Sequence, residues 1–301
     1  MNTNISRRRL FTMLAATGGS IVLPGIGAAL AMDAGQVAHR INKADRMSML
    51  TERTAKAVAL LRLGVNREED LKQLLGAHDE INDILLGFMK GEGSSGVTRE
   101  RIVGIQIRVT EVETLWAPVR TAVEEILASG EVDDAHFELV VSSDEALEDA
   151  CHHVVKGVED AYGGVDIDAS LAMAIDLAGR QRMITQKMTK ELALVALGHN
   201  VEHESEAFVK NCKKFGKIVD LLIAGGSDYL TIVEPPSADA KDALLAVKAH
   251  WDEILPLAEE LHATAMPSPE QVKTYAEQSE KMLTECDNVT NLYERFVAGI
   301  G

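Results

Sequence analysis

The pattern of apolar and polar residues along this chain predicts helices. No segment shows the sustained alternation of apolar and polar residues that is typical of a β-strand. Long segments lie instead between helix-stopping residues such as Gly64 and Gly198. Thr98 is the expected cap of a third helix, and Pro118 predicts a kink inside it. The predicted helices cover approximately residues 34–63, 67–89, 98–128, 131–162, 168–197, 202–224, 238–263 and 269–297.

The second half of the chain repeats the first. Residues 41–66 align on residues 175–200 without a gap, and eleven of the 26 positions are identical, where background composition would give about one or two. The offset is 134, and it becomes 135 farther along, where Trp116 aligns with Trp251. We therefore interpret the chain as an all-α tandem duplication of a four-helix bundle. The two predicted units are residues 32–164 and 165–301, joined at Gly163-Gly164.

The first 31 residues predict an export signal. The segment Ser6-Arg7-Arg8-Arg9-Leu10-Phe11 precedes a weakly apolar stretch, and Ala29-Leu30-Ala31 fits the small-x-small pattern of a signal-peptidase site. The arrangement resembles a twin-arginine (Tat) export signal, with Leu10 and Phe11 in swapped order. The resemblance implies cleavage after Ala31 and a periplasmic mature protein. The alternative is an uncleaved anchor helix, which the Gly and Pro content disfavours.

The charge balance limits the partners that we expect. The 301 residues include 47 acidic and 30 basic side chains, which gives a formal charge of −17. Such a field repels nucleic acid and anionic membrane surfaces, so we expect neither as a partner after signal cleavage. Any anion that the protein binds must therefore be held by a few hydrogen-bond donors or basic side chains that point directly at it.

The sequence lacks the motifs of the common catalytic and cofactor sites. It has no nucleophile–base motif, no phosphate-binding loop and no C-x-x-C-H haem motif. Cys151-His152-His153 hints at a metal, but adjacent residues diverge around a helix. We therefore expect no enzymatic activity, no catalytic residue, no metal and no cofactor. Cys151 and Cys286 are equivalent positions, and they either form a disulfide where the last helices meet or are buried as separate thiols.

The helix predicted over residues 168–197 carries the most informative residues. Gly179 lies in its interior, where a Gly costs about 1 kcal/mol relative to Ala. Arg182 follows on the same face and supplies planar hydrogen-bond donors. Together they suggest a pocket for a small anion or carboxylate. The alternative, which the pattern alone favours, is a helix–helix contact at Gly179 beside a solvated Arg182.

Two segments resemble the first helix of the PilJ/NarX-type sensor family, the type IV pili methyl-accepting chemotaxis transducer N-terminal domain. They are INKADRMSML and, more closely, IDLAGRQRMITQKMTKELAL. The resemblance implies a four-helix sensor bundle in the periplasm. In the family's nitrate sensors, the first helices of two subunits clasp one anion with an Arg and the backbone beside a Gly. Those positions fall here on Arg182 and Gly179.

The first half departs from the family pattern, because Asp45 stands in place of Gly179 and Ser48 in place of Arg182. Fusion of the two halves would form the family's two-subunit site within one chain. Asp45 then either pairs with Arg182 and fills the pocket, rejecting nitrate, or makes the pocket select a ligand with both a donor and an acceptor.

Arg46 and Arg180 are present in both halves, as candidates for the pocket mouth or as solvated helix charges. We therefore predict an exported ligand-binding or sensory-type protein that holds a small anion or small polar ligand and acts through a protein partner. The alternatives are a metal- or cofactor-bearing bundle and a structural partner of envelope machinery. The candidate ligand-binding residues are Asp45, Arg46, Ser48, Gly179, Arg180 and Arg182.

Overall fold

A computed structural model describes residues 33–162, 168–226, 232–264 and 266–300. Within these residues the chain is helical and has no strand, which confirms the predicted all-α fold. The predicted signal and the predicted junction at Gly163-Gly164 lie outside them. The helices are α1 (Ala34–Leu63), α2 (Arg67–Lys90), α3 (Val103–Ser129), α4 (Asp134–Tyr162), α5 (Ala169–Ala196), α6 (Val201–Ala224), α7 (Ala238–Ala263) and α8 (Pro269–Val297).

Capping residues set the ends of α1 and the start of α8. The side chain of Asp33 accepts a hydrogen bond from the backbone N–H of Gln36 at 2.8 Å. Gly64 ends α1 in the left-handed region, with a φ of 74°, where other residues are strained. Ser268 caps α8 as Asp33 caps α1, and Pro269 takes the first helical position. Both helices have the predicted bounds.

The predicted start of the third helix is wrong. α3 begins at Val103 and not at Thr98. The carbonyl and hydroxyl oxygens of Thr98 each accept a hydrogen bond from the buried Arg40 guanidinium at 2.8 Å. A contact with α1 therefore engages the side chain that would have capped the helix. α3 then continues through Pro118 to Ser129.

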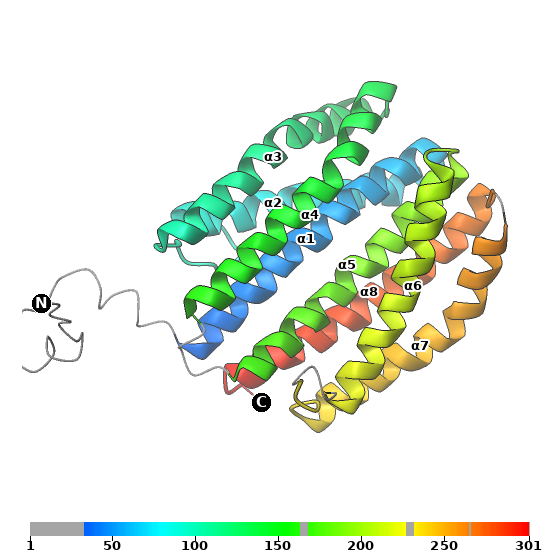
Figure 1. The fold of residues 1–301 in the computed structure, drawn as a ribbon. Coiled ribbons are helices and arrows are strands. Elements are labelled where there is room, and N and C mark those ends of the chain that lie inside the picture. The colour runs from blue at the N-terminus through cyan, green and yellow to red at the C-terminus, as the bar shows by residue number, and fades with distance from the viewer. Residues whose placement is uncertain (1–32, 163–167, 227–231, 265, 301) are drawn as a thin grey trace, which may run out of the picture. The chain divides into compact units, whose positions relative to one another are not determined.

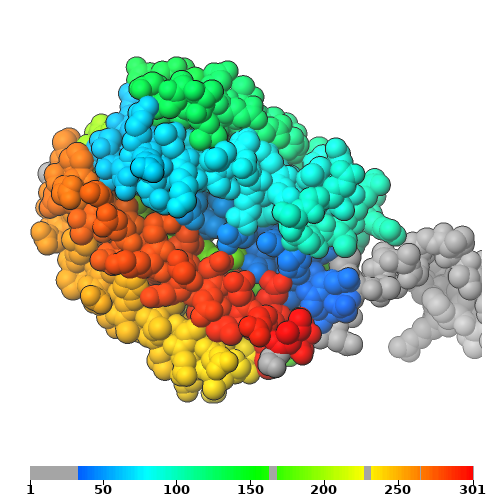
Figure 2. Space-filling model, turned by 180° about the vertical axis from the view of Figure 1, so that it is seen from behind, coloured from blue at the N-terminus to red at the C-terminus, as the bar shows by residue number. Residues whose placement is uncertain are grey.

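The helices form two four-helix bundles, and α1 and α5 lie side by side between them (Figure 1). In the first bundle α1 packs against α2 and α4, and α3 completes the ring. In the second bundle α5 packs against α6 and α8, and α7 completes the ring. α8 also contacts α1: His39 Nδ1 lies 2.7 Å from Glu294 Oε1, and Figure 2 shows the end of α8 beside the start of α1.

The bounds of α2, α4, α6 and α8 follow the two offsets of the predicted duplication. α2 and α6 begin and end 134 residues apart, from 67 to 201 and from 90 to 224. α4 and α8 begin and end 135 residues apart, from 134 to 269 and from 162 to 297. The duplication itself stays a prediction, but the offsets pair each residue of the first bundle with a counterpart in the second.

Most of each bundle is packed with apolar side chains, and each buries one tryptophan, Trp116 or Trp251. Among the described helices, none has a stretch long and apolar enough to cross a membrane. The contact between α1 and α5 differs from the rest of the core, because polar and charged residues are buried there. The residues predicted from the sequence as a ligand site lie along this contact.

Candidate ligand-binding site

The contact between α1 and α5, which we call the seam, buries groups that water would otherwise solvate. Such groups are costly to bury unless each one finds a partner. The way each group is paired therefore decides what the seam can bind. The buried polar residues that the two helices bring to it include Asp45, Ser48, Glu52, Arg182, Gln186 and Lys190.

Asp45 occupies the space that the missing side chain of Gly179 leaves. A Cβ built on Gly179 would lie 2.6 Å from Asp45 Oδ2 and 2.8 Å from Asp45 Cγ, closer than real Cβ atoms approach. The two residues are counterparts at offset 134, so equivalent positions of α1 and α5 face each other here. Gly179 therefore admits a side chain of the first bundle.

The environment of Asp45 favours its protonated form. Burial, followed by the nearby Asp176, raises the pKa of Asp45 well above its usual range, although Arg182 and Arg180 act in the opposite direction. Asp45 Oδ2 is buried and has no hydrogen-bond partner among the described residues. The carboxyl group thus remains able to bind one more polar group.

The hypothesis of an ion pair between Asp45 and Arg182 is wrong. Arg182 Nη1 lies 2.9 Å from Asp287 Oδ1 of α8, and Nη2 donates to the Asn42 carbonyl at 3.3 Å. Asp45 has no ion pair within 4 Å in the part of the chain that the structure describes. The reason is that α8 brings Asp287 to the guanidinium, while the Asp45 carboxylate lies against Gly179.

Arg46 joins Arg182 in one ion cluster. Arg46 Nη1 lies 2.9 Å from Asp287 Oδ1, and the same guanidinium pairs with Glu80 of α2. Burial by itself raises the pKa of Asp287, but Arg182 and Arg46 lower it below its usual range. These two arginines and two carboxylates fill their part of the seam, which we call the closed side.

The equivalent place on the other side of the seam contains a cavity of about 220 Å³, which we call the open side. Ser48 stands there as the counterpart of Arg182, and its side chain is too short to fill the space. His152 stands there as the counterpart of Asp287, so the carboxylate that binds the arginines on the closed side is absent. The cavity is lined by Asp45, Ser48, Glu148, Asp149, His152, Arg180, Met183 and Lys214.

Three basic side chains face this cavity. Lys214, the counterpart of Glu80, has no ion pair within 4 Å among the described residues. Arg180 Nε pairs with Asp176 at 2.9 Å, and Arg180 Nη2 lies 3.3 Å from each ring nitrogen of His152. Burial, together with Arg180, lowers the pKa of His152, so the neutral imidazole is favoured. Arg180 and Lys214 therefore supply the positive charge of the cavity.

Acidic side chains face the same cavity. Glu148 pairs with Lys187 of α5, and its pKa is raised by burial and by Glu52. Asp149 is exposed, and Asp45 lines the cavity with a carboxyl group that has no ion pair among the described residues. The open side can therefore bind an anionic group at its basic residues and a hydrogen-bond donor at its acidic ones.

The predicted site residues divide between the two sides of the seam. Asp45, Ser48 and Arg180 line the cavity. Gly179 lies behind Asp45, whereas Arg46 and Arg182 belong to the closed side.

Besides Met183 of α5, sequence reasoning missed four lining residues, which come from α4 and α6. The repeat contained a usable signal for two of them. At offset 135 the neutral or basic His152 aligns with Asp287, and at offset 134 the basic Lys214 aligns with the acidic Glu80. The four residues from α4 and α6 are Glu148, Asp149, His152 and Lys214.

The cysteines are not paired. Cys151 and Cys286 are both buried as free thiols, and Cys212 is a half-buried free thiol. Burial raises the pKa of Cys151 and of Cys286 above its usual range. Among the described residues, no group of three or more His, Cys, Asp or Glu side chains could hold a metal ion.

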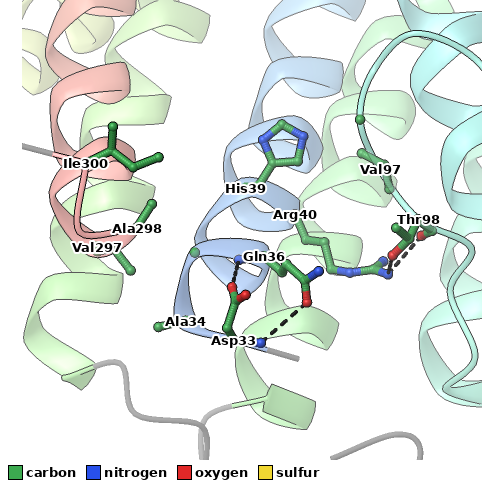
Figure 3. Close-up of a pocket in the computed structure, with 12 residues that line it drawn as sticks. Asp33, Ala34, Gln36, His39, Arg40, Val97, Thr98, Val297, Ala298 and Ile300 are labelled. Atoms are coloured by element: carbon green, nitrogen blue, oxygen red, sulfur yellow. Dashed lines mark hydrogen bonds between the residues drawn. The ribbon is translucent and has the colours of Figure 1, made fainter. Parts of the chain in front are cut away.

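A second cavity, of about 540 Å³, lies where α1 begins (Figure 3). His39 and Arg40 project from α1 toward its walls, and the end of α8 forms the opposite wall. Both side chains already have partners: His39 contacts Glu294 and the Ser95 carbonyl, and Arg40 donates to Thr98. Since these polar groups are satisfied, the open side of the seam is the stronger candidate.

Comparison with known proteins supports the resemblance over the second bundle. Residues 168–282 match the PilJ family model. This model is described as "Type IV pili methyl-accepting chemotaxis transducer N-term". The match extends from the start of α5 into α8 and includes Gly179, Arg180 and Arg182. No curated protein matches the chain. The PilJ description is compatible with a sensory role.

Proposed function

We propose that this protein is an exported, sensory-type protein that binds a small polar ligand in the open side of the seam. The observation that carries the proposal is the difference between two equivalent places. Arg182, Arg46 and Asp287 fill one of them, whereas Ser48 and His152 leave a cavity in the other. The predicted duplication and the PilJ match both support a family site built within one chain.

The charges of the cavity favour a ligand that carries an anionic group and a hydrogen-bond donor. Arg180 and Lys214 attract the anionic group, and the carboxyl group of Asp45 accepts from the donor. A simple anion such as nitrate would be attracted by the basic residues but repelled by Asp149. The cavity of about 220 Å³ is smaller than the roughly 300–1,000 Å³ of sites for drug-sized ligands. We therefore favour a small zwitterion or hydroxy acid.

A ligand in this cavity would contact both bundles at once, since α1 and α4 supply part of the lining and α5 and α6 the rest. Binding can therefore bias the relative position of α1 and α5, which is the kind of differential contact that a sensor needs. The output would pass to a protein partner. The predicted Tat-type signal supports a periplasmic location.

A thermal-shift screen of the purified full chain tests the proposal. The panel contains nitrate, nitrite, small amino acids and small hydroxy acids. A ligand at 100 times its Kd adds about 2.7 kcal/mol to the free energy of unfolding. We expect a zwitterion or hydroxy acid to raise the unfolding temperature. Lys214→Glu should abolish this shift, because it replaces a cation that attracts the ligand with the negative charge that Glu80 has at the equivalent position.

Lys210→Glu is the matched control, since Lys210 is also an exposed lysine of α6 but does not line this cavity. Its ligand shift should equal that of the unmodified protein. The proposal fails if no compound shifts the unfolding temperature. It also fails if Lys210→Glu and Lys214→Glu reduce a shift equally.

A further inference from the structure

The two tryptophans occupy equivalent positions but differ in one hydrogen bond. Trp116 in α3 is fully buried, and its Nε1 donates to Asn82 Oδ1 of α2 at 2.9 Å. Trp251 in α7 is 3% exposed, and its Nε1 has no acceptor among the described residues. The Trp251 N–H is not fully shielded from solvent, so it can donate to a group that enters the space beside it.

The missing acceptor has a direct cause in the sequence. The counterpart of Asn82 at offset 134 is Gly216, which has no side chain. A Cβ built on Gly216 would lie 3.1 Å from Trp251 Nε1, so the indole N–H points at the bare backbone of α6. The place of the Asn82 amide is therefore vacant in the second bundle.

This vacancy is part of a cavity of about 600 Å³ between α6 and α7. The ring of Trp251 forms one wall, with its centroid 4.8 Å from that of the tilted Phe215 ring, and Phe208 and Leu255 add apolar surface. The indole N–H is thus a hydrogen-bond donor that borders the cavity beside apolar side chains. No residue that lines this cavity lines the open side of the seam.

Three lysines and three carboxylates line the α6–α7 cavity, and two of the lysines have no ion pair within 4 Å among the described residues. These two, Lys213 and Lys217, lie one helical turn apart. Their counterparts in α2 are Asp79 and Asp83, so the sign of the charge is reversed at both positions. Like charges at this spacing destabilise a helix by a few tenths of a kcal/mol, and an anion would remove that cost.

Acidic groups at the rim are balanced only in part. Lys248 pairs with Asp252 at 2.5 Å and lies 3.9 Å from Asp220. Glu259 also lines the cavity, and exposed His262 stands beside it with Nδ1 at 3.2 Å from Ser205 Oγ. The chain has a formal charge of −17, so most of its surface repels anions. Two lysines without an ion pair in the described part of the chain, beside an apolar wall, are a local departure from that charge.

We propose that the α6–α7 cavity is a second binding site, which takes an organic carboxylate with an apolar body. An oxygen of this ligand accepts the hydrogen bond from Trp251 Nε1, the apolar body lies against the tryptophan and Phe208, and Lys213 and Lys217 attract the negative charge. This site goes beyond the proposed function of the seam, and neither site depends on the other.

Fluorescence titration of the full chain with anilinonaphthalene sulfonate, an apolar organic anion, tests this proposal. Octanoate is the competing carboxylate. We expect saturable binding that octanoate displaces. Gly216→Asn should weaken the binding at least about tenfold, because the amide fills the cavity and bonds to Trp251 as Asn82 bonds to Trp116.

Two further variants make the outcome decisive. Gly76→Asn is the matched control, since it makes the same change at an exposed position of α2 with nothing within 4 Å, and it should leave the binding unchanged. Lys213→Asp combined with Lys217→Asp copies the charges of α2 and should also weaken binding about tenfold.

The proposal is overturned if the unmodified protein does not bind the probe or if octanoate does not displace it. It is also overturned if folded Gly216→Asn binds as well as the control. Circular dichroism and the unfolding temperature establish which variants are folded. Should Gly216→Asn not fold, unchanged binding by the double lysine variant overturns the proposal by itself.

Discussion

The closed and open sides of the seam occupy equivalent places, yet one is full and the other hollow. On the closed side Arg182 and Arg46 share Asp287. On the open side Ser48 replaces the first arginine and His152 replaces the carboxylate. A symmetric dimer presents the same residues on both sides of its axis, whereas two halves in one chain can change independently. Under the proposed function, a fusion of two halves would let one side stabilise the protein and the other bind a ligand.

The asymmetry continues farther along the seam. Glu52 of α1 is fully buried and lies 2.7 Å from Lys190 Nζ, which also pairs with Asp144 of α4. Burial by itself lowers the pKa of Lys190, but Glu52 and Asp144 raise it well above its usual range. The counterpart of Glu52 is the neutral Gln186. The charges of the seam are therefore balanced by the pair of Glu52 with Lys190, which has no equivalent at Gln186, and by carboxylates of α4 and α8.

The largest expected effect is a difference in the free energy of unfolding between the alanine variants of Arg182 and of its counterpart Ser48. Arg182→Ala should lower the free energy of unfolding by about 3 kcal/mol, because it removes a fully buried cation and leaves Asp287 with one arginine partner instead of two. Ser48→Ala should change it by less than about 0.5 kcal/mol, since its hydroxyl borders the cavity. Urea unfolding followed by circular dichroism measures both. Equal losses would contradict the division into a closed and an open side.

An intermediate effect is expected where the two bundles touch at Gly179. Gly179→Ala should cost about 1–3 kcal/mol, because the new Cβ would overlap Asp45 Oδ2 and Cγ. In an Asp45→Gly background the same substitution should cost about 1–2 kcal/mol less, since the obstructing side chain is gone.

The control for Gly179→Ala is Gly76→Ala, at a helical glycine with nothing within 4 Å. There the added methyl group should stabilise the protein by up to about 1 kcal/mol, through helix propensity. The double-mutant cycle is measured by urea unfolding. A coupling free energy near zero would show that Asp45 does not fill the space at Gly179.

The sequence predicts the helices well because their ends are encoded locally. Asp33, Gly64 and Pro269 act within one turn of the helix that they start or stop. Thr98 failed as a cap because Arg40, 58 residues away, takes its oxygens. Local sequence does not contain that contact.

The candidate site is less predictable, because its partners come from helices that are distant in the chain. The alignment of the two halves pairs Asp45 with Gly179, and the structure brings these two residues into contact. The alignment does not reveal that Asp287, 105 residues beyond Arg182, is the residue that pairs with the guanidinium. Only the packing of α8 against both α1 and α5 brings this carboxylate to the seam.

The effect most specific to the comparison is the opposite pH dependence of Asp45 and Asp287. The pKa of Asp287 is lowered by its arginines, so its contribution to stability is present above the usual value of 3.8 and is lost as the pH falls through the lowered pKa. The pKa of Asp45 is raised by burial, so the folded protein retains a proton that the unfolded chain releases. Its contribution therefore declines as the pH rises above 3.8.

Asn substitutions at the two positions separate these contributions. Relative to the unmodified protein, Asp45→Asn should gain stability as the pH rises from about 4, by at most about 1.4 kcal/mol per pH unit. Asp287→Asn should be less stable at neutral pH, and its deficit should shrink as the pH falls below about 4. Urea unfolding between about pH 3 and 8 measures both differences. Burial raises the pKa of Glu191 to about 8, so its contribution to stability also declines as the pH rises. This contribution is the same in the variant and in the unmodified protein, so it cancels in each difference. Difference curves with the same slope would mean that the two sides of the seam do not differ electrostatically.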